Sequence, residues 1–241
     1  FDAFDQALSA AEVRALILCN PHNPVGRVWS RVELERMAAI CLRHGVSIIS
    51  DEIHCDLIYS ESRHLPIASL SPEVSRQTVT LMAPSKTFNI AGLDCSFAIV
   101  QDEGLRKQMN QARLGLVKSP NILGFTAALA AYKDGGDWLA ELLTYLQANR
   151  DYVVGYVRDH LPGVRVCSPE ATYLAWLDCR ALELPTSPAE HFLRSARVAL
   201  NEGRDFGPGG EGFVRLNFGC PRSVLVEALE RMRRSLEGQP G

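Results

Sequence analysis

Short apolar runs alternate with longer amphipathic stretches along the first half of the chain. The runs cover residues 15–19, 46–49, 78–82 and 96–100. Their length and their β-branched and aliphatic composition predict buried strands. Between the first two runs, Ser30 and Glu33 form a capping box that opens a helix, and Gly45 ends it. A strand, a helix and a second strand in this order predict a βαβ unit with parallel strands and a right-handed crossover.

Helical patterns account for most of the remaining chain. Besides the helix between the first two strands, we expect helices over residues 4–13, 102–114, 121–132, 137–161, 188–202 and 222–236. The segment between the second and third strands is expected to be irregular because Pro66 and Pro72 interrupt it. Two glycines, Gly135 and Gly136, separate two of the helices, and Asp137 is expected to cap the second of them.

Beyond Pro162 the pattern changes from long helices to short strands. Strand signals occur at residues 164–167, 172–178 and 213–218. Between them, Ser187 and Glu190 form a second capping box with Pro188 at the first helical position. Strands and helices of this kind predict a small α+β domain.

The change of pattern predicts two domains. The first is α/β, with a mostly parallel sheet flanked by helices, and the second is smaller and α+β. The long helix over residues 137–161 is of the kind that bridges two domains, so we place the boundary inside it near Tyr145. The predicted domains cover residues 1–145 and 146–241.

Composition places the chain among ordinary soluble proteins. It has 241 residues, of which 46% are hydrophobic, and its formal net charge is -3. No basic excess indicates nucleic acid, no charge block indicates an interaction tail, and no apolar run is long enough to span a membrane. The seven cysteines include no CxxC pair and fall in predicted core segments, so reduced thiols and a cytoplasmic location are expected.

Polar side chains follow three of the predicted strands. Asn23 lies in the loop after the first, Asp51 follows the second, and Lys86 follows the third. Open parallel sheets bind ligands at the carboxyl ends of their strands, so an amide, a carboxylate and an amine are expected at one edge. A lysine at the mouth of a buried strand can lose its charge by desolvation and form a Schiff base with a carbonyl cofactor. The set suits a pyridine aldehyde phosphate, whose ring nitrogen, ring hydroxylate and aldehyde need these three groups.

Taken singly, each of these residues has an ordinary structural explanation. A lysine after a strand is usually a solvated surface residue, Asp51 could be a helix N-cap, and Asn23 could serve only to start a turn before proline. Asp51, His54 and Asp56 could also be considered as metal ligands, but no histidine cluster lies nearby. The coincidence of three groups at successive strand ends favours the cofactor interpretation and no metal.

Three segments carry a resemblance to a known family: NPHNPVGRVW, SDEIHCDL and APSKTFNIAGL. They resemble the fold-type I pyridoxal-phosphate enzymes of aminotransferase class I/II, and more narrowly the MalY/PatB-type carbon–sulfur β-lyases (cystathionine β-lyase-like). The resemblance runs from about Asp2 to the last predicted helix and implies the fold of that family, with an incomplete large domain. The motifs are specific for the cofactor, pyridoxal 5'-phosphate, and much less specific for the reaction.

The resemblance implies cofactor roles for five residues. Lys86 would carry the cofactor and act as general base, and Asp51 would hold the ring nitrogen protonated. Asn23 would bond the ring hydroxylate, as would His54, which stands where many relatives have a tyrosine; a satisfied loop histidine is the alternative. Ser85 would bond the cofactor phosphate.

The resemblance also implies two substrate-binding residues. Arg215 lies inside the apolar run 213–218, and a buried guanidinium needs an anion. The family pattern makes that anion the substrate α-carboxylate, whereas a structural ion pair with Glu170 or Asp178 is the alternative. Tyr173 is expected either in the core or facing the substrate.

Two positions depart from the family pattern. Ala83 stands where many relatives have a serine, and Asp94 stands where relatives often have arginine or lysine for the phosphate. Relatives carry a phosphate-binding loop at a helix N-terminus upstream, and no Gly-rich loop precedes Asn20 here. We therefore expect a fragment whose phosphate site is weak or is completed by an upstream segment and a partner subunit.

The activity implied by the resemblance is elimination of a thiol from a sulfur amino acid, giving pyruvate and ammonia. An aminotransferase is an alternative, because no residue of the chain separates the two reactions. A non-catalytic role, as a regulator or an inactive fragment of this fold, is another. The family forms homodimers, so the intact protein is expected to be a homodimer that acts on a small amino acid, without a nucleic-acid or membrane partner.

Overall fold

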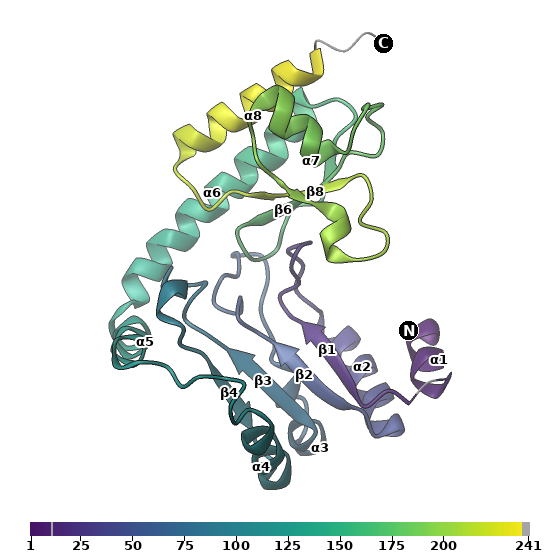
Figure 1. Ribbon diagram of the computed structural model, residues 1–241, viewed down its shortest axis with the longest axis vertical. Helices are drawn as coiled ribbons and strands as arrows, with labels where there is room; N and C mark the ends of the chain where they lie inside the picture. Colours follow the sequence, from purple (N-terminus) through teal and green to yellow (C-terminus); the bar gives the residue numbers. More distant parts are fainter. Residues whose placement is uncertain (11, 238–241) are drawn as a thin grey trace. The chain divides into compact units, whose positions relative to one another are not determined.

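The computed structural model describes residues 1–10 and 12–237 and forms two compact units (Figure 1). The first unit contains Phe1–Pro21 and Val28–Ala140, and the second contains His22–Arg27 and the chain from Glu141 onward. The break after Ala140 falls inside the long helix α6 (Gly136–His160). Each unit has its own sheet.

The sheet of the first unit has four strands in sequence order. They are β1 (Ala15–Cys19), β2 (Ser47–Asp51), β3 (Thr78–Met82) and β4 (Phe97–Val100). The first three strands are parallel and β4 runs antiparallel to β3, so the prediction of a mostly parallel sheet is confirmed. In register, Asp51 is the partner of both Cys19 and Leu81, so the carboxyl ends of the parallel strands are level.

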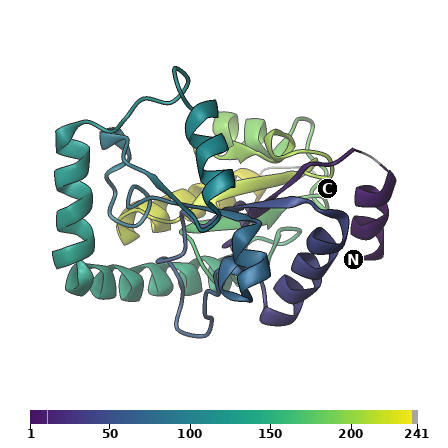
Figure 2. The ribbon, with the colours of Figure 1, turned by 90° about the horizontal axis from the view of Figure 1, so that it is seen from below.

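Helices of the first unit pack on this sheet and on one another. They are α1 (Asp2–Ala10), α2 (Arg31–His44), α3 (Pro72–Arg76), α4 (Glu103–Ala112) and α5 (Ile122–Asp134), together with the start of α6. The predicted capping box of α2 is present: Ser30 accepts from the Glu33 N–H, and the Glu33 carboxylate accepts from the Ser30 N–H. Figure 2 shows α1 beside α2, and the Asp5 carboxylate bonds Arg43 and His44 across that contact.

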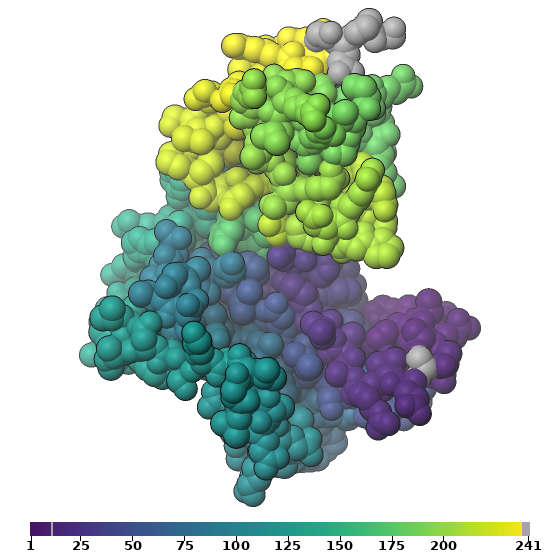
Figure 3. All heavy atoms as spheres, viewed as in Figure 1, coloured from purple at the N-terminus to yellow at the C-terminus, as the bar shows by residue number. Residues whose placement is uncertain are grey.

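The core of the first unit lies between α2 and the sheet. Its buried apolar side chains include Leu18, Leu34, Cys41, Ile48, Ile67 and Val74. By contrast, the segment from α4 to α5, dark teal in Figure 3, lies at the surface of this unit. Several large apolar side chains there are exposed, namely Leu114, Leu116, Val117, Ile122, Leu123, Phe125 and Leu129. Apolar sequence therefore does not mean buried side chains in this segment.

The second unit is a small antiparallel sheet covered by helices, as expected for an α+β domain. Its strands are β5 (Arg165–Val166), β6 (Leu174–Asp178), β7 (Asn201–Glu202) and β8 (Phe213–Asn217), in the order β5-β6-β8-β7. Helices α7 (Pro188–His191) and α8 (Arg222–Glu237) belong to the same unit. Register places Arg215 between Trp176 on β6 and Asn201 on β7.

Four local expectations are wrong. The first and fourth apolar runs do not form buried strands, since β1 and β4 are largely exposed, with exposed fractions of 74% for Ile17, 41% for Phe97 and 49% for Ile99. The helix predicted over residues 188–202 ends early: α7 passes into one π-helical turn over Phe192–Ala196, and Arg197 then adopts a left-handed conformation with φ 57°. Pro72 does not break the chain but starts α3, with Ser71 as the N-cap, because proline is well suited to the first helical turn. The long helix begins at Gly136, so Asp137 lies inside its first turn rather than before it.

Among the described helices, none is long and apolar enough to cross a bilayer.

Candidate active site

The carboxyl edge of the first unit's sheet is held level by backbone hydrogen bonds beyond the strands. The Asn20 N–H donates to the Asp51 carbonyl at 3.0 Å, and the Glu52 N–H donates to the Leu81 carbonyl at 2.9 Å. These bonds continue the parallel ladder past the strand ends. They hold the carboxyl edge of this sheet in place, and open parallel sheets bind ligands at that edge.

Asp51 is the last residue of β2, not the residue after the strand as the sequence pattern placed it. Its side chain is half-buried, and one carboxylate oxygen accepts from the Ile53 N–H at 3.3 Å. Together with Leu81 and Phe97, it lines a pocket of about 480 Å³. A carboxylate held this way presents its remaining lone pairs to a cavity, where it can accept from a cationic ring N–H.

Lys86 lies in a turn that follows β3. The Phe88 N–H donates to the Pro84 carbonyl at 2.9 Å, and the Ile90 N–H donates to the Ser85 carbonyl at 3.2 Å. The Lys86 side chain is half-buried and makes no hydrogen bond or ion pair with the described part of the chain. An amine in this position is available for reaction with a carbonyl group. Ser85, also half-buried, is its neighbour.

His54 lies in the connection that leaves β2. Its side chain is buried, with 4% of its surface exposed, and its carbonyl accepts from the Leu57 N–H at 2.9 Å. The structure therefore makes His54 an interior residue of this connection. Within residues 1–10 and 12–237, no group of three or more His, Cys, Asp and Glu side chains is arranged to hold a metal ion.

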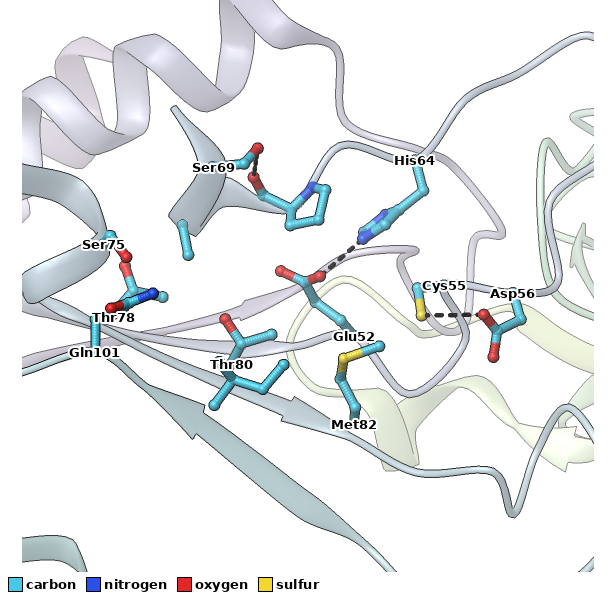
Figure 4. Close-up of a pocket in the computed structure, with 13 residues that line it drawn as sticks. Glu52, Cys55, Asp56, His64, Ser69, Ser75, Thr78, Thr80, Met82 and Gln101 are labelled. Carbon is cyan, nitrogen blue, oxygen red and sulfur yellow. Dashed lines mark hydrogen bonds and ion pairs between the residues drawn. The ribbon is translucent and has the colours of Figure 1, made fainter. Parts of the chain in front are cut away.

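A buried acid that the sequence reasoning missed follows Asp51 directly. Glu52 is 1% exposed and accepts from the Ser50 hydroxyl at 2.8 Å. It also accepts from His64 Nε2 at 2.8 Å (Figure 4). The pair lines a second pocket, of about 580 Å³, with Thr78 and Thr80 of β3. A glutamate at the end of a buried strand signals that a partner is needed, but nothing in the sequence identifies His64, twelve residues later, as that partner.

The loop that carries Asn23 belongs to the second unit. It is closed on itself by bonds between His22 and Arg27 and between Gly26 and His22. The Gly26 carbonyl accepts from the N–H groups of Glu170 and Ala171, at 2.8 and 2.9 Å. Gly26 has φ 77°, and a Cβ there would lie 2.7 Å from the Pro169 Cβ, so the position requires glycine.

Asn23 and Arg215, which are 192 residues apart in the sequence, are joined by a short hydrogen bond. Arg215 Nη1 donates to Asn23 Oδ1 at 2.7 Å, and Nη2 donates to Asn201 Oδ1 at 2.9 Å. The guanidinium also lies over the Phe206 ring, 4.7 Å from its centroid. Asn23 and Arg215 were predicted separately from the sequence. The bond shows that they lie side by side in the second unit.

The charge of Arg215 is not balanced by an acid. All its partners in the described part of the chain are neutral, and its buried Nε has none. The alternative partner Asp178 bonds Arg180 instead. Burial lowers the pKa of Arg215, with Tyr173 opposing that shift, yet a guanidinium remains a cation at neutral pH. A half-buried cation of this kind is able to bind an anion.

Tyr173 directly precedes β6 in the same unit. It is half-buried, and its burial raises the pKa of its hydroxyl. Asp51, His54, Ser85 and Lys86 thus all belong to the first unit. The structure brings Asn23, Tyr173 and Arg215 together in the second.

Comparison with known proteins identifies the family. Residues 1–232 match the family of aminotransferases class I and II. The chain belongs to this family. The prediction made from the three motifs is therefore confirmed at the level of the family and its fold.

Individual relatives and solved structures show which members of the family the chain resembles. Cystathionine β-lyase PatB of Bacillus subtilis is 43% identical over 98% of this chain, which spans 62% of that relative. The structure of cystalysin from Treponema denticola, which contains a pyridoxal 5'-phosphate cofactor, is 34% identical with a TM-score of 0.94, over 98% of this chain and 60% of that one. A PLP-bound putative aminotransferase from Clostridium difficile is 43% identical with a TM-score of 0.91, over 97% and 61%. The chain thus spans about three fifths of the length of these relatives.

Proposed function

We propose that the protein containing this chain is a pyridoxal-phosphate-dependent carbon–sulfur β-lyase. Its substrate would be a sulfur amino acid such as cystathionine or a cysteine conjugate, and its products a thiol, pyruvate and ammonia. The observation that carries the proposal is that Asp51 ends β2 and the unpaired Lys86 amine follows β3, the parallel strand next to it in the same unit. The similarity to cystathionine β-lyase PatB supports the choice of reaction.

The donor and acceptor groups of the chain fit this cofactor. Asp51 would accept a hydrogen bond from the protonated ring nitrogen, and Lys86 would bind the aldehyde carbon. The amide of Asn23 would donate to the ring hydroxylate while its oxygen stays bonded to Arg215. His54 would support that hydroxylate, and the Ser85 hydroxyl would donate to the phosphate. When bound, pyridoxal phosphate supplies an electron sink for charge that develops at the substrate Cα.

The substrate would be oriented by the second unit's residues. Arg215 would bind the α-carboxylate through its unpartnered Nε–H and its remaining N–H groups, since carboxylates are the anions that a guanidinium fork matches. Asn23 and Asn201 hold the guanidinium in place from two sides. Tyr173 would line the substrate side of this site.

Lys86 would act as the general base. Its amine, when not bonded to the cofactor, would take the Cα proton of the substrate. Asp51 would keep its negative charge next to the ring nitrogen throughout, which stabilises the cationic form of the ring. The electron pair of the broken Cα–H bond would form a Cα–Cβ double bond as the sulfur leaves with the C–S pair as a thiolate, and one water would then hydrolyse the enamine product to pyruvate and ammonia.

The test uses the whole protein, wild type and Lys86→Ala, incubated with pyridoxal phosphate and reduced with borohydride. The expected result is that the cofactor mass is fixed on the Lys86 peptide of the wild type and is absent from the variant. The wild type should also release pyruvate and ammonia from cystathionine without a 2-oxo acid. Retention of cofactor attachment and activity by Lys86→Ala would refute the assignment.

The aminotransferase reaction is the second candidate, favoured by the 43% identity to the PLP-bound putative aminotransferase. It shares every step up to removal of the Cα proton. The product test separates the two reactions, because activity that requires a 2-oxo acid indicates transamination. A protein that neither attaches the cofactor nor turns over substrate would support the third possibility, a non-catalytic regulator or inactive form of this fold.

We further propose that the intact protein is a cytoplasmic homodimer without a nucleic-acid or membrane partner. Exposed apolar side chains between α4 and α5, including Leu116 and Ile122, form a surface of the first unit that a second subunit would bury. The net charge of -3 supports the absence of a nucleic-acid partner. Light scattering of the whole protein at micromolar concentration tests the dimer, and a monomer mass would contradict it.

A further inference from the structure

The turn that carries Lys86 is anchored by the residue next to it. Thr87 is 1% exposed, and its hydroxyl donates to Asp56 Oδ2 at 3.1 Å. The turn itself is short, closed only by the Phe88 and Ile90 N–H groups. A side-chain bond at its centre therefore determines the direction in which the Lys86 side chain leaves the backbone.

Asp56 belongs to the connection that begins at Asp51. This connection, residues 52–57, is formed by two successive turns, Cys55 N–H to the Glu52 carbonyl and Leu57 N–H to the His54 carbonyl. Figure 4 shows Asp56 beside Cys55, whose thiol donates to Asp56 Oδ1 at 3.7 Å. Burial and the neighbouring carboxylates raise the pKa of Cys55 to about 12, so this thiol remains a donor at neutral pH. Both oxygens of Asp56 thus have partners that hold it in one orientation.

The opposite side of the turn is packed against aromatic rings. Phe88 stacks on Trp138, with centroids 5.8 Å apart, and meets Tyr132 edge-on at 5.8 Å. Gly135 makes this possible, since a Cβ there would lie 2.6 Å from the Phe88 ring. The aromatic contacts hold the turn at Phe88. The bond from Thr87 to Asp56 holds it at the neighbouring residue and joins it to the connection that begins at Asp51.

We propose that Asp56 is a positioning residue that, through Thr87, aims Lys86 at the cofactor held by Asp51. The inference rests on the proposed function, in which Asp51 and Lys86 hold opposite ends of one ring. Two bridges then set the spacing of those groups: the backbone bond from Glu52 to Leu81, and the side-chain bond from Thr87 to Asp56. Asp56 itself contacts neither the amine nor the cofactor.

The test compares variants that remove the bond with variants of similar shape that keep it. Thr87→Val removes the hydroxyl while preserving the branched side chain, and Thr87→Ser keeps the hydroxyl. Asp56→Ala removes the acceptor, and Asp56→Asn keeps a neutral one. Each is made in the whole protein. Two readouts are taken: the rate at which borohydride fixes pyridoxal phosphate on Lys86, and hydrogen exchange at the Phe88 and Ile90 amides without cofactor.

The bond-breaking variants are expected to attach the cofactor about tenfold more slowly or worse, because a hydrogen bond to a charged acceptor is lost. They should also exchange the two turn amides about tenfold faster, while Thr87→Ser and Asp56→Asn stay within about threefold of the wild type. The double variant Asp56→Ala/Thr87→Val should be no worse than either single variant, since both remove the same bond.

The proposal is overturned if Thr87→Val attaches the cofactor at the wild-type rate, or if the conservative variants lose as much as the disruptive ones. It is also overturned if the double variant shows the product of the two single effects. Failure of the proposed function gives a different pattern. In that case the wild type fixes no cofactor on Lys86, while the exchange of the turn amides still reports whether the Thr87–Asp56 bond holds the turn.

Discussion

The buried pair Glu52–His64 offers the clearest test of how the first unit is stabilised. The Glu52 side chain is 1% exposed and that of His64 is 10% exposed, and they meet at 2.8 Å. The substitution His64→Ala would leave the Glu52 carboxylate with the Ser50 hydroxyl as its remaining donor within the described part of the chain, in a place that water hardly reaches. Breaking a buried ion pair from one side costs about 3–5 kcal/mol.

This penalty is large enough to measure by thermal unfolding. For a chain of this size, each kcal/mol shifts the midpoint by roughly 2–4 °C, so His64→Ala should lower it by roughly 6–20 °C. The matched control is His44→Ala. His44 also pairs with a carboxylate, that of Asp5 at 2.6 Å, but both side chains are partly exposed, and such pairs contribute about 0–1 kcal/mol.

A second substitution isolates the charge as the cause. Adding Glu52→Gln to His64→Ala removes the unpaired negative charge while keeping nearly the same shape. We expect the double variant to recover at least half of the lost stability, because a buried amide costs far less than a buried carboxylate. The reasoning is refuted if His64→Ala costs no more than His44→Ala, or if the glutamine brings no recovery.

Three further predictions concern other parts of the chain. Arg215→Lys, which loses the planar fork, should raise the KM for the amino-acid substrate tenfold or more with a smaller change in kcat, as steady-state kinetics will show. Gly26→Ala should lower the unfolding free energy by about 1–3 kcal/mol in urea titrations, because the residue has positive φ and no room for a Cβ. Burial raises the pKa of Cys41 to about 11 and that of Cys179 to about 12, so both thiols stay protonated at pH 8. A disulfide reagent should therefore modify the exposed Cys167 first and reach the other two only after denaturation.

The sequence predicted those elements whose determinants are local. The helix between β1 and β2 begins and ends with a capping box and a left-handed Gly45, and each of these signals is contained within a few residues. The strands of the first sheet were likewise predicted to within about two residues at each end, because short apolar runs between turn residues are typical of strands.

What could not be predicted depends on partners distant in sequence. The left-handed Arg197 ends a helix that the pattern would continue, and the short β7 forms only because β8 lies beside it. The same holds for the site. Residue types at strand ends were enough to propose Asp51 and Lys86 as site residues, but the bonds from His64 to Glu52 and from Thr87 to Asp56 required the fold to be known.

The assignment of His22–Arg27 to the second unit has a consequence for biosynthesis. On the ribosome, this hexapeptide emerges well before the groups it binds, near Pro169 and at Arg215, the second of which follows Asn23 by 192 residues. The smaller unit therefore cannot acquire its native form until the chain from the hexapeptide through Arg215 has been translated. A piece cut to start at Glu141 would lack the His22–Arg27 segment that binds Arg215. Cutting the chain within α6 would therefore leave the second unit incomplete.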